Sequence, residues 1–224
     1  MSAIFITGTG TDIGKTYLAT VLIRYLRGKR HAVDALKPVV TGFDPARLEA
    51  SDSGRLLAAL ECPVTPDEIA RISPWRYSAP LSPDMAAARE GRTLDFDQLV
   101  DFSRKAVREH PGKLLIEGVG GIMVPLDARR TVLDWMSALK VPLLLVAGSY
   151  LGSISHTLTC LDVLRRHELS VRAVVVNETS GSTVSVVDAI DSMSRFAQPT
   201  PVLALSRSGG HDAGSQIARI AELL

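Results

Sequence analysis

The chain has few cysteines and almost no net charge, and both shortages exclude whole classes of protein. Only two cysteines occur in 224 residues, Cys62 and Cys160, which are too few for a disulfide framework and do not have the spacing of a metal site. We therefore expect two buried free thiols and a reducing compartment. The formal net charge of +1 argues against a strongly basic surface that would bind nucleic acid.

The sequence also lacks a long apolar run, and its first residues do not have the pattern of a secretory leader. No stretch approaches the roughly 20 apolar residues that a membrane-spanning helix needs. The N-terminus has the pattern of a strand, not of a charged segment followed by an apolar secretory core, so we expect a cytoplasmic protein with no membrane partner. With 46% hydrophobic residues, residues 1–224 can form one α/β domain around a sizeable core.

Short apolar segments alternate with amphipathic segments along the chain. The apolar runs predict strands at 3–7, 32–36, 113–117, 142–147, 171–176 and 201–205. The helical patterns cover 15–27, 52–60, 95–109, 152–167, 182–197 and 213–224. The runs at 143–147 and 173–176 are continuous and not alternating, which indicates strands buried on both faces of a parallel sheet. We therefore predict a mostly parallel central sheet flanked by helices on both faces, with the proline-rich stretch 61–94 wrapping the surface.

A glycine-rich segment, GTGTDIGKT at residues 8–16, follows the first predicted strand and precedes the first predicted helix. Glycines let such a turn point several N–H groups at one anion, to which the helix N-terminus adds a partial positive charge. Lys15 can reach the outer phosphates of a nucleotide, and the hydroxyl of Thr16 can bind Mg²⁺. The usual first glycine would stand at Thr9, but glycines stand at 8 and 10 instead. The segment predicts a nucleoside triphosphate with Mg²⁺ and a P-loop NTPase-like fold.

Polar residues follow three other predicted strands, and the carboxyl ends of parallel strands meet at one edge of a sheet. Lys37 could neutralise charge on a transferring phosphoryl group, although most lysines are simply surface residues. Glu117 could hold Mg²⁺ or be a solvated carboxylate at a strand end. Asn177 could bind the adenine edge or stabilise a turn. The guanine-binding pattern Asn-Lys-x-Asp is absent at 177–180, which favours ATP over GTP.

Asp52 has two interpretations that the sequence leaves open. It lies in Ala50-Ser51-Asp52-Ser53, directly before a helical pattern. A carboxylate there can cap the helix N-terminus. It can equally serve as a magnesium ligand near the predicted nucleotide.

Together these motifs resemble dethiobiotin synthetase, the ATP-dependent enzyme that closes the ureido ring in biotin synthesis. The resemblance covers nearly the whole chain and includes the longer glycine spacing. It rests on the segments 7–16, 37–42, 51–52, 80–83, 117–121 and 152–156. It implies a homodimer that condenses 7,8-diaminononanoate with CO₂ or bicarbonate and ATP, giving dethiobiotin, ADP and phosphate. The reaction would run through a carbamate and a mixed carbamic–phosphoric anhydride.

The resemblance also implies a role for each matching residue. Lys15 and Lys37 would be catalytic, and Thr16, Asp52 and Glu117 would hold Mg²⁺. The diamine, its carbamate or its carboxylate would contact Thr11, Lys37, Thr41, Gly152, Ser153 and Ser155. The nucleotide would contact Asp12, Ile13, Gly14, Lys15, Thr16, Tyr17, Asp52, Glu117, Gly118, Val119, Gly120, Asn177, Glu178, Leu203, Ala204, Leu205 and Ser206. Gly10, Ser155 and Asp84 stand where many family members have Asp, Asn and His.

Two other functions compete with this one. A related amide-forming synthetase of the cobyric-acid type is generally longer and carries a glutaminase domain, and neither Cys62 nor Cys160 lies in a nucleophile-like turn. An ATP-switched partition ATPase usually has a second lysine near the start of its phosphate loop. Residues 8–14 contain no such lysine.

Overall fold

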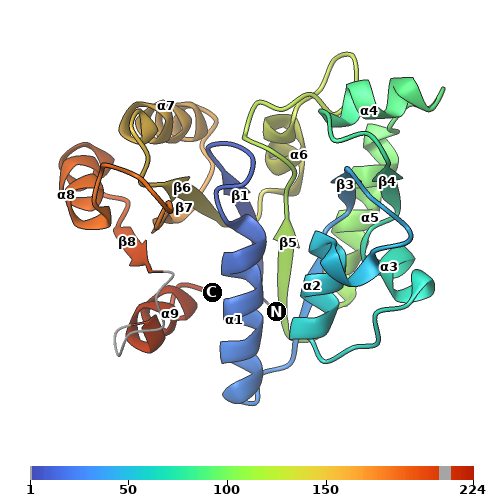
Figure 1. The fold of residues 1–224 in the computed structure, drawn as a ribbon, viewed down its shortest axis with the longest axis horizontal. Coiled ribbons are helices and arrows are strands. Elements are labelled where there is room, and N and C mark those ends of the chain that lie inside the picture. Colours follow the sequence, from blue (N-terminus) through green and yellow to red (C-terminus); the bar gives the residue numbers. More distant parts are fainter. Residues whose placement is uncertain (1, 207–212) are drawn as a thin grey trace.

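The first strand of the chain lies in the interior of a six-stranded sheet (Figure 1). The computed structural model describes residues 2–206 and 213–224. Across the sheet, the strands are β2 (Val33–Leu36), β5 (Lys113–Glu117), β1 (Ser2–Gly8), β6 (Leu143–Gly148), β7 (Val171–Asn177) and β8 (Val202–Leu205). Every neighbouring pair is parallel, which confirms the predicted α/β class.

The register of the strands brings the predicted site residues together at one edge. Ile6 of β1 lies opposite Glu117 of β5, and Leu36 of β2 lies opposite Ile116. Lys37, the residue after β2, is therefore level with Glu117. The phosphate loop follows β1 at the same edge, as expected for the carboxyl ends of a parallel sheet.

Helices cover both faces of the sheet (Figure 1). They are α1 (Lys15–Gly28), α2 (Asp52–Ala59), α3 (Pro66–Ile72), α4 (Pro83–Arg89), α5 (Phe96–Glu109), α6 (Val132–Leu139), α7 (Ser153–Arg166), α8 (Val186–Ala197) and α9 (Ala213–Ala221), with a 3₁₀ turn η1 (Leu48–Ala50). Consecutive helices pack against each other in the pairs α1–α2, α5–α6 and α7–α8, and α1 also contacts α9 from the far end of the chain.

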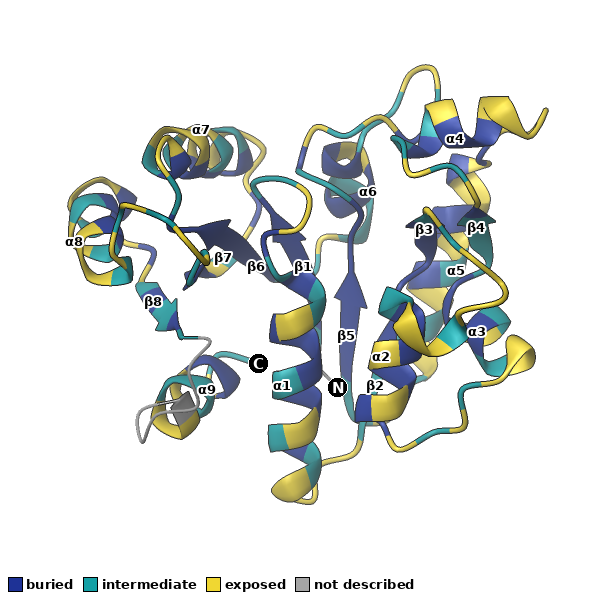
Figure 2. Ribbon diagram, viewed as in Figure 1, coloured by how far each residue is buried: buried dark blue, intermediate teal, exposed yellow. Residues whose placement is uncertain are grey.

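The continuous apolar runs are buried on both faces, as the sequence predicts. All six residues of β6 are buried, and so are the last five of β7 (Figure 2). Helix α5 begins with a side-chain cap, because the Asp95 carboxylate accepts from the Gln98 backbone N–H. Helix α8 begins later than predicted, at Val186, because Ser185 caps it by accepting from the Asp188 N–H.

The prediction that 61–94 is an irregular surface stretch is wrong. This stretch contains α3, α4 and the strand β4 (Trp75–Tyr77), which pairs in parallel with β3 (Val39–Thr41). Ile72 and Tyr77 are buried. Two of the prolines mark helix starts and not loops, because proline at the first helical position has a suitable φ and its missing N–H costs no intrahelical bond. Pro66 and Pro83 occupy such positions.

Helix α6 was absent from the sequence prediction, although a local signal for it exists. The Thr131 side chain accepts a hydrogen bond from the Asp134 backbone N–H, and the Asp134 carboxylate accepts one from the Thr131 N–H. This reciprocal pair is a capping box. The thiols also differ from expectation, since Cys62 and Cys160 are free but only half-buried. Within residues 2–206 and 213–224, no helix is long and apolar enough to cross a membrane.

Candidate active site

A cleft of about 670 Å³ opens at the carboxyl edge of the sheet, beside the first turn of α1. Its walls bring together twelve of the residues that the sequence assigns to a site. These are Thr11, Asp12, Gly14, Lys15, Thr16, Tyr17, Lys37, Thr41, Asp52, Glu117, Val119 and Gly120. They come from four separate parts of the chain, so the parallel topology and not local sequence creates the cleft.

The phosphate loop owes its shape to Gly14 and to Asn177 behind it. Gly14 has φ +98°, and a Cβ there would lie 2.0 Å from Asn177 Nδ2. Asn177 ends β7, is buried, and donates from Nδ2 to the Ile13 carbonyl at 2.9 Å. Only glycine combines this left-handed backbone with the close approach of a neighbouring side chain. Asn177 therefore supports the loop, and its predicted contact with adenine stays a prediction.

Lys15, the first residue of α1, is folded back into the loop. Its Nζ donates to the Gly10 carbonyl at 2.6 Å, and the residue is only 6% exposed. Burial, with a further contribution from Lys37, lowers the pKa of Lys15 to about 8, although Glu117, Asp52 and Asp12 oppose this. An anion bound in the loop would stabilise the ammonium form of Lys15, because a nearby negative charge raises the pKa that burial has lowered.

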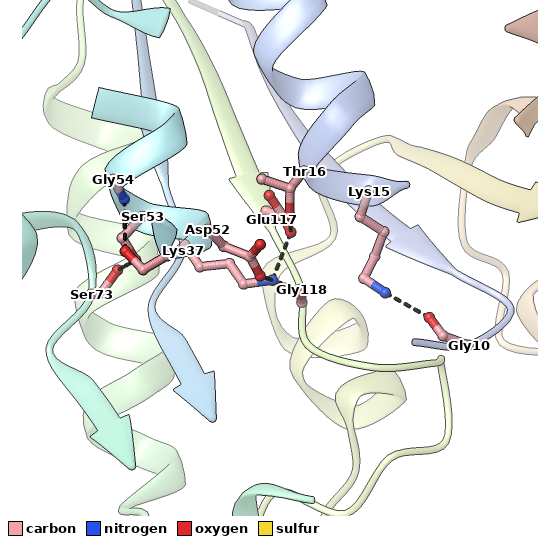
Figure 3. A network of polar contacts seen from close by, with 11 residues as sticks. Gly10, Lys15, Thr16, Lys37, Asp52, Ser53, Gly54, Ser73, Glu117 and Gly118 are labelled. Carbon is pink, nitrogen blue, oxygen red and sulfur yellow. Dashed lines mark hydrogen bonds and ion pairs between the residues drawn. The ribbon is translucent and has the colours of Figure 1, made fainter. Parts of the chain in front are cut away.

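Lys37 lies at the floor of the cleft, and the alternative that it is a surface lysine is wrong. The side chain is 4% exposed, and its Nζ lies 2.6 Å from Glu117 Oε1, 2.8 Å from the Gly118 carbonyl and 3.5 Å from Asp52 Oδ2 (Figure 3). Burial would lower the pKa of Lys37, but the two carboxylates outweigh it and raise that pKa. The ammonium group is therefore kept charged at a fixed point.

Three oxygen-bearing side chains converge beside this ammonium group. The Thr16 hydroxyl donates to Glu117 Oε1 at 2.7 Å, and Glu117 Oε2 is buried with no hydrogen-bond partner among the described residues. Asp52 is less enclosed: burial raises its pKa, but the nearby charge of Lys37 lowers it on balance. Hydroxyl and carboxylate oxygens are the donors that Mg²⁺ prefers, so the set fits this ion.

The two carboxylates do not by themselves make a metal cage. In the part of the chain that the structure describes, no group of three or more His, Cys, Asp or Glu side chains could hold a metal ion. This is the arrangement expected for Mg²⁺ that is bound through one or two carboxylates together with nucleotide phosphates.

The capping interpretation of Asp52 is wrong, because the neighbouring serine fills that role. Ser51 is the N-cap of α2, and its Oγ accepts from the Gly54 N–H at 3.0 Å. Asp52 is the first residue of the helix and turns its carboxylate toward Lys37 (Figure 3). The carboxylate is thus available to a ligand in the cleft.

Other predicted residues lie outside the cleft lining. Leu203 and Leu205 turn their side chains into the core, so only the backbone of this segment can face a ligand. The Tyr17 hydroxyl lies 3.5 Å from the Ser206 carbonyl, which joins α1 to the end of β8. The remaining residues outside the lining are Ile13, Gly118, Gly152, Ser153, Ser155, Asn177, Glu178 and Ala204.

The start of α7 contains three of these residues and has the features of an anion site. Gly152, with φ +94°, precedes the helix and gives no side-chain cap. The Ser153 Oγ is buried and has no hydrogen-bond partner within the described ranges. A helix N-terminus attracts negative charge, so a carboxylate would suit this position.

Some residues that line the cleft were missed in the sequence. Arg55, Val40, Leu81 and Val124 belong to its walls. Arg55 had a usable signal, because it stands three residues after Asp52 on a helix and so shares its face. The apolar residues had none, since their sequence pattern is that of ordinary core positions.

Comparisons with known proteins agree with the motif resemblance. Residues 2–205 match the family model described as an AAA domain. The chain is 48% identical over 219 residues to the ATP-dependent dethiobiotin synthetase BioD of Methylobacterium nodulans, covering 95% of this chain and 96% of that protein. It is 46% identical over 202 residues to the protein of that name from Acidiphilium cryptum, covering 90% and 91%.

The MinC:MinD cell division protein complex of Aquifex aeolicus contains a chain of similar fold. The TM-score is 0.58 at 12% identity, covering 99% of this chain and 94% of that one. At this identity the likeness shows the P-loop fold and not a shared activity. The curated relatives, in contrast, match at high identity over nearly their whole length. The chain therefore belongs to the ATP-dependent dethiobiotin synthetase family.

Proposed function

We propose that residues 1–224 act as one catalytic domain that converts 7,8-diaminononanoate, CO₂ and ATP into dethiobiotin, ADP and phosphate. One amine of the substrate captures CO₂ as a carbamate and releases a proton. A carbamate oxygen attacks the γ-phosphorus and ADP leaves, which forms the mixed anhydride. The second amine attacks the anhydride carbonyl and expels phosphate. The cluster of Lys37, Glu117, Asp52 and Thr16 beside the phosphate loop carries this proposal.

Residues in and around the cleft would position the substrates and the developing charge. Lys15 would move from the Gly10 carbonyl to the outer phosphates, and Lys37 would contact the carbamate and the transferring phosphoryl group. Thr41 and Thr11, both in the cleft wall, would contact the diamine. Such chemistry depends on orientation and on fixed charges more than on a protein nucleophile. Asn177 and the backbone of 203–206 would contact adenine.

Mg²⁺ is the cofactor that fits Thr16, Asp52 and Glu117. When bound, it would neutralise charge shared between the outer phosphates. The unpartnered Glu117 Oε2 supports this assignment. A buried carboxylate oxygen has lost its contact with water and needs a hydrogen-bond donor or an ion in its place.

A coupled assay tests the proposed reaction. We expect release of phosphate from ATP to require diaminononanoate, bicarbonate and Mg²⁺ together, since no acceptor exists until the carbamate forms. Omission of any one of the three is the control. Rapid ATP hydrolysis without the diamine would instead support an ATP-switched ATPase.

Variants of the two carboxylates test the metal site. We expect Glu117→Gln and Asp52→Asn to raise the Mg²⁺ concentration needed for half-maximal activity, because each removes an anionic oxygen near a hard cation. Titration of Mg²⁺ at saturating substrates measures the effect. Asp95→Asn is a matched control at an exposed helix cap that does not line the cleft. An unchanged Mg²⁺ requirement in Asp52→Asn would remove Asp52 from the site.

We infer that the enzyme is a homodimer in which the start of α7 completes the partner's site. Gly152, Ser153 and Ser155 lie outside the cleft of their own chain, yet they offer a helix N-terminus suited to the substrate carboxylate. A second copy related by a twofold axis would bring them to the cleft. The exposed Leu151 beside them, which is 83% exposed, would be covered in such a dimer.

Mixed dimers test this arrangement. Lys37→Gln removes the floor of the cleft, and Ser155→Asp places a negative charge at the carboxylate site, so each variant alone should have little activity. Mixing the two should restore activity, because each mixed dimer has one site in which both residues are intact. Sedimentation shows whether dimers form. If activity stays absent after mixing, the site is built from one chain.

A further inference from the structure

Two buried serine hydroxyls face each other behind the cluster of charged residues. Ser53 Oγ and Ser73 Oγ are 2.6 Å apart, and both residues are fully buried (Figure 3). Ser53 belongs to α2 and Ser73 follows α3, so their hydrogen bond joins two separate parts of the chain. Neither residue lines the cleft, and neither has a role in the proposed reaction.

The turn that contains Ser73 is fastened to the backbone around Lys37. The Lys37 N–H donates to the Ile72 carbonyl at 3.0 Å, and the Trp75 N–H donates to the Pro38 carbonyl at 3.0 Å. Residues 72–75 thus run beside Lys37 and Pro38 with a hydrogen bond on each side of Ser73. A displacement of the Lys37 and Pro38 backbone relative to this turn would strain these bonds.

On the other side, the hydrogen bond reaches the residue next to Asp52. Ser53 directly follows Asp52 in the first turn of α2. Ser51 also holds this turn, but only through residues close to it in the sequence. Its Oγ donates to the Leu48 carbonyl and accepts from the Gly54 N–H. The Ser53–Ser73 bond therefore ties the first turn of α2 to the turn beside Lys37, in addition to the packing of α2 against α1, α3 and β2.

Asp52 needs such support more than Glu117 does. Lys37 Nζ lies 2.6 Å from Glu117 but 3.5 Å from Asp52, whose side chain is 40% exposed. A separation of 3.5 Å is at the limit of a hydrogen bond and leaves the oxygen loosely placed. The Ser53–Ser73 hydrogen bond holds its geometry more strictly, because separating the two buried hydroxyls would leave both without a partner.

We propose that Ser53 and Ser73 are a positioning pair that sets the distance between the Asp52 carboxylate and the Lys37 ammonium group. The proposal rests on the proposed role of Asp52 as a magnesium ligand. Loss of the bond would let the start of α2 shift, so that Asp52 no longer meets an ion held by Thr16 and Glu117. Among the described residues, no hydrogen bond joins the phosphate loop to the side chains of this pair, so the loop would still bind the nucleotide.

Calorimetry of ADP binding, with and without Mg²⁺, tests the pair independently of turnover. In Ser53→Ala and Ser73→Ala we expect the Mg²⁺ concentration that half-maximally tightens ADP binding to rise about fivefold, the ratio typical of one neutral hydrogen bond. ADP affinity without Mg²⁺ should not change. The double variant should be no worse than the more affected single variant, because the two residues act through one bond.

Ser103→Ala is a matched control for the loss of a buried hydroxyl. Ser103 is also fully buried, accepts from Trp135 Nε1 at 3.2 Å and donates to the Leu99 carbonyl at 2.8 Å. It does not line the cleft. We expect this variant to lower Tm without changing the Mg²⁺ requirement. The same behaviour in Ser53→Ala and Ser73→Ala would overturn the positioning role and leave only a structural one.

Asp52→Asn in the same experiment distinguishes a failure of the proposed metal site from a failure of the positioning pair alone. If Asp52→Asn raises the Mg²⁺ requirement but the serine variants do not, the positioning pair is refuted and the proposed metal site stands. If Asp52→Asn has no effect, Asp52 is not a ligand, and both the metal assignment and the positioning pair fail.

Discussion

Replacement of Lys37 by glutamine is expected to reduce turnover by about 10²–10³-fold, the usual loss when one preorganised electrostatic donor is removed. The reason is geometric as well as electrostatic. The ammonium group is buried, hydrogen-bonded to Glu117 and to the Gly118 carbonyl, and kept charged by two carboxylates. Its stabilisation of the transferring phosphoryl group therefore requires no rearrangement during the reaction. ATP affinity, measured by calorimetry, should stay near normal.

Arginine should rescue this loss poorly, because a planar fork cannot replace a compact ammonium group in a closed space. Lys105→Gln, at an exposed lysine of α5, is the matched control and should have normal activity. Lys37→Gln also leaves Glu117 with a buried charge that has lost its partner, so Tm should fall. Turnover must therefore be compared well below the Tm of the variant. Turnover within about threefold of the parent, far short of the expected loss, would refute the role.

Replacement of Lys15 by alanine is expected to weaken ATP binding by at least about tenfold, the effect of one charge-assisted hydrogen bond, and to abolish ring closure. The structure buries Lys15 against the Gly10 carbonyl. Because burial disfavours its charged form, loss of the side chain should not reduce the free energy of unfolding at pH 7. Calorimetry with ATP and thermal unfolding measure the two effects separately.

The pH dependence of unfolding gives this prediction a second readout. The pKa of Lys15 is lowered from 10.5 to about 8 in the folded chain. Between these pH values the unfolded chain binds the proton more tightly, so the stability of the parent should rise with pH. Lys15→Ala should lack this rise. A folded Lys15→Ala protein with unchanged ATP affinity and activity would exclude the phosphate-loop assignment.

Features that depend on contiguous residues were predictable from the sequence. The glycine loop at 8–16, the buried strands and the cap at Asp95 each depend on a short pattern whose physical cause is local. The same holds for the edge of the sheet at which the site lies, because parallel strands place all their carboxyl ends together. The helices missed within 61–94 and at α6 also had local signals in the sequence. Pro66 and Pro83 stand at the first turns of α3 and α4, and Thr131 forms a capping box with Asp134 at the start of α6.

What the sequence by itself determined is the class of fold, the phosphate loop and the list of polar residues near it. Only the tertiary structure decided which of these residues meet. Lys37 and Glu117 are 80 residues apart in the chain, yet their side chains are in hydrogen-bond contact. Likewise, the bond between Ser53 and Ser73 arises only because the turn at 72–75 packs against the start of α2. Such contacts depend on the register of strands and the packing of helices, to which every part of the core contributes, and no short segment contains that information.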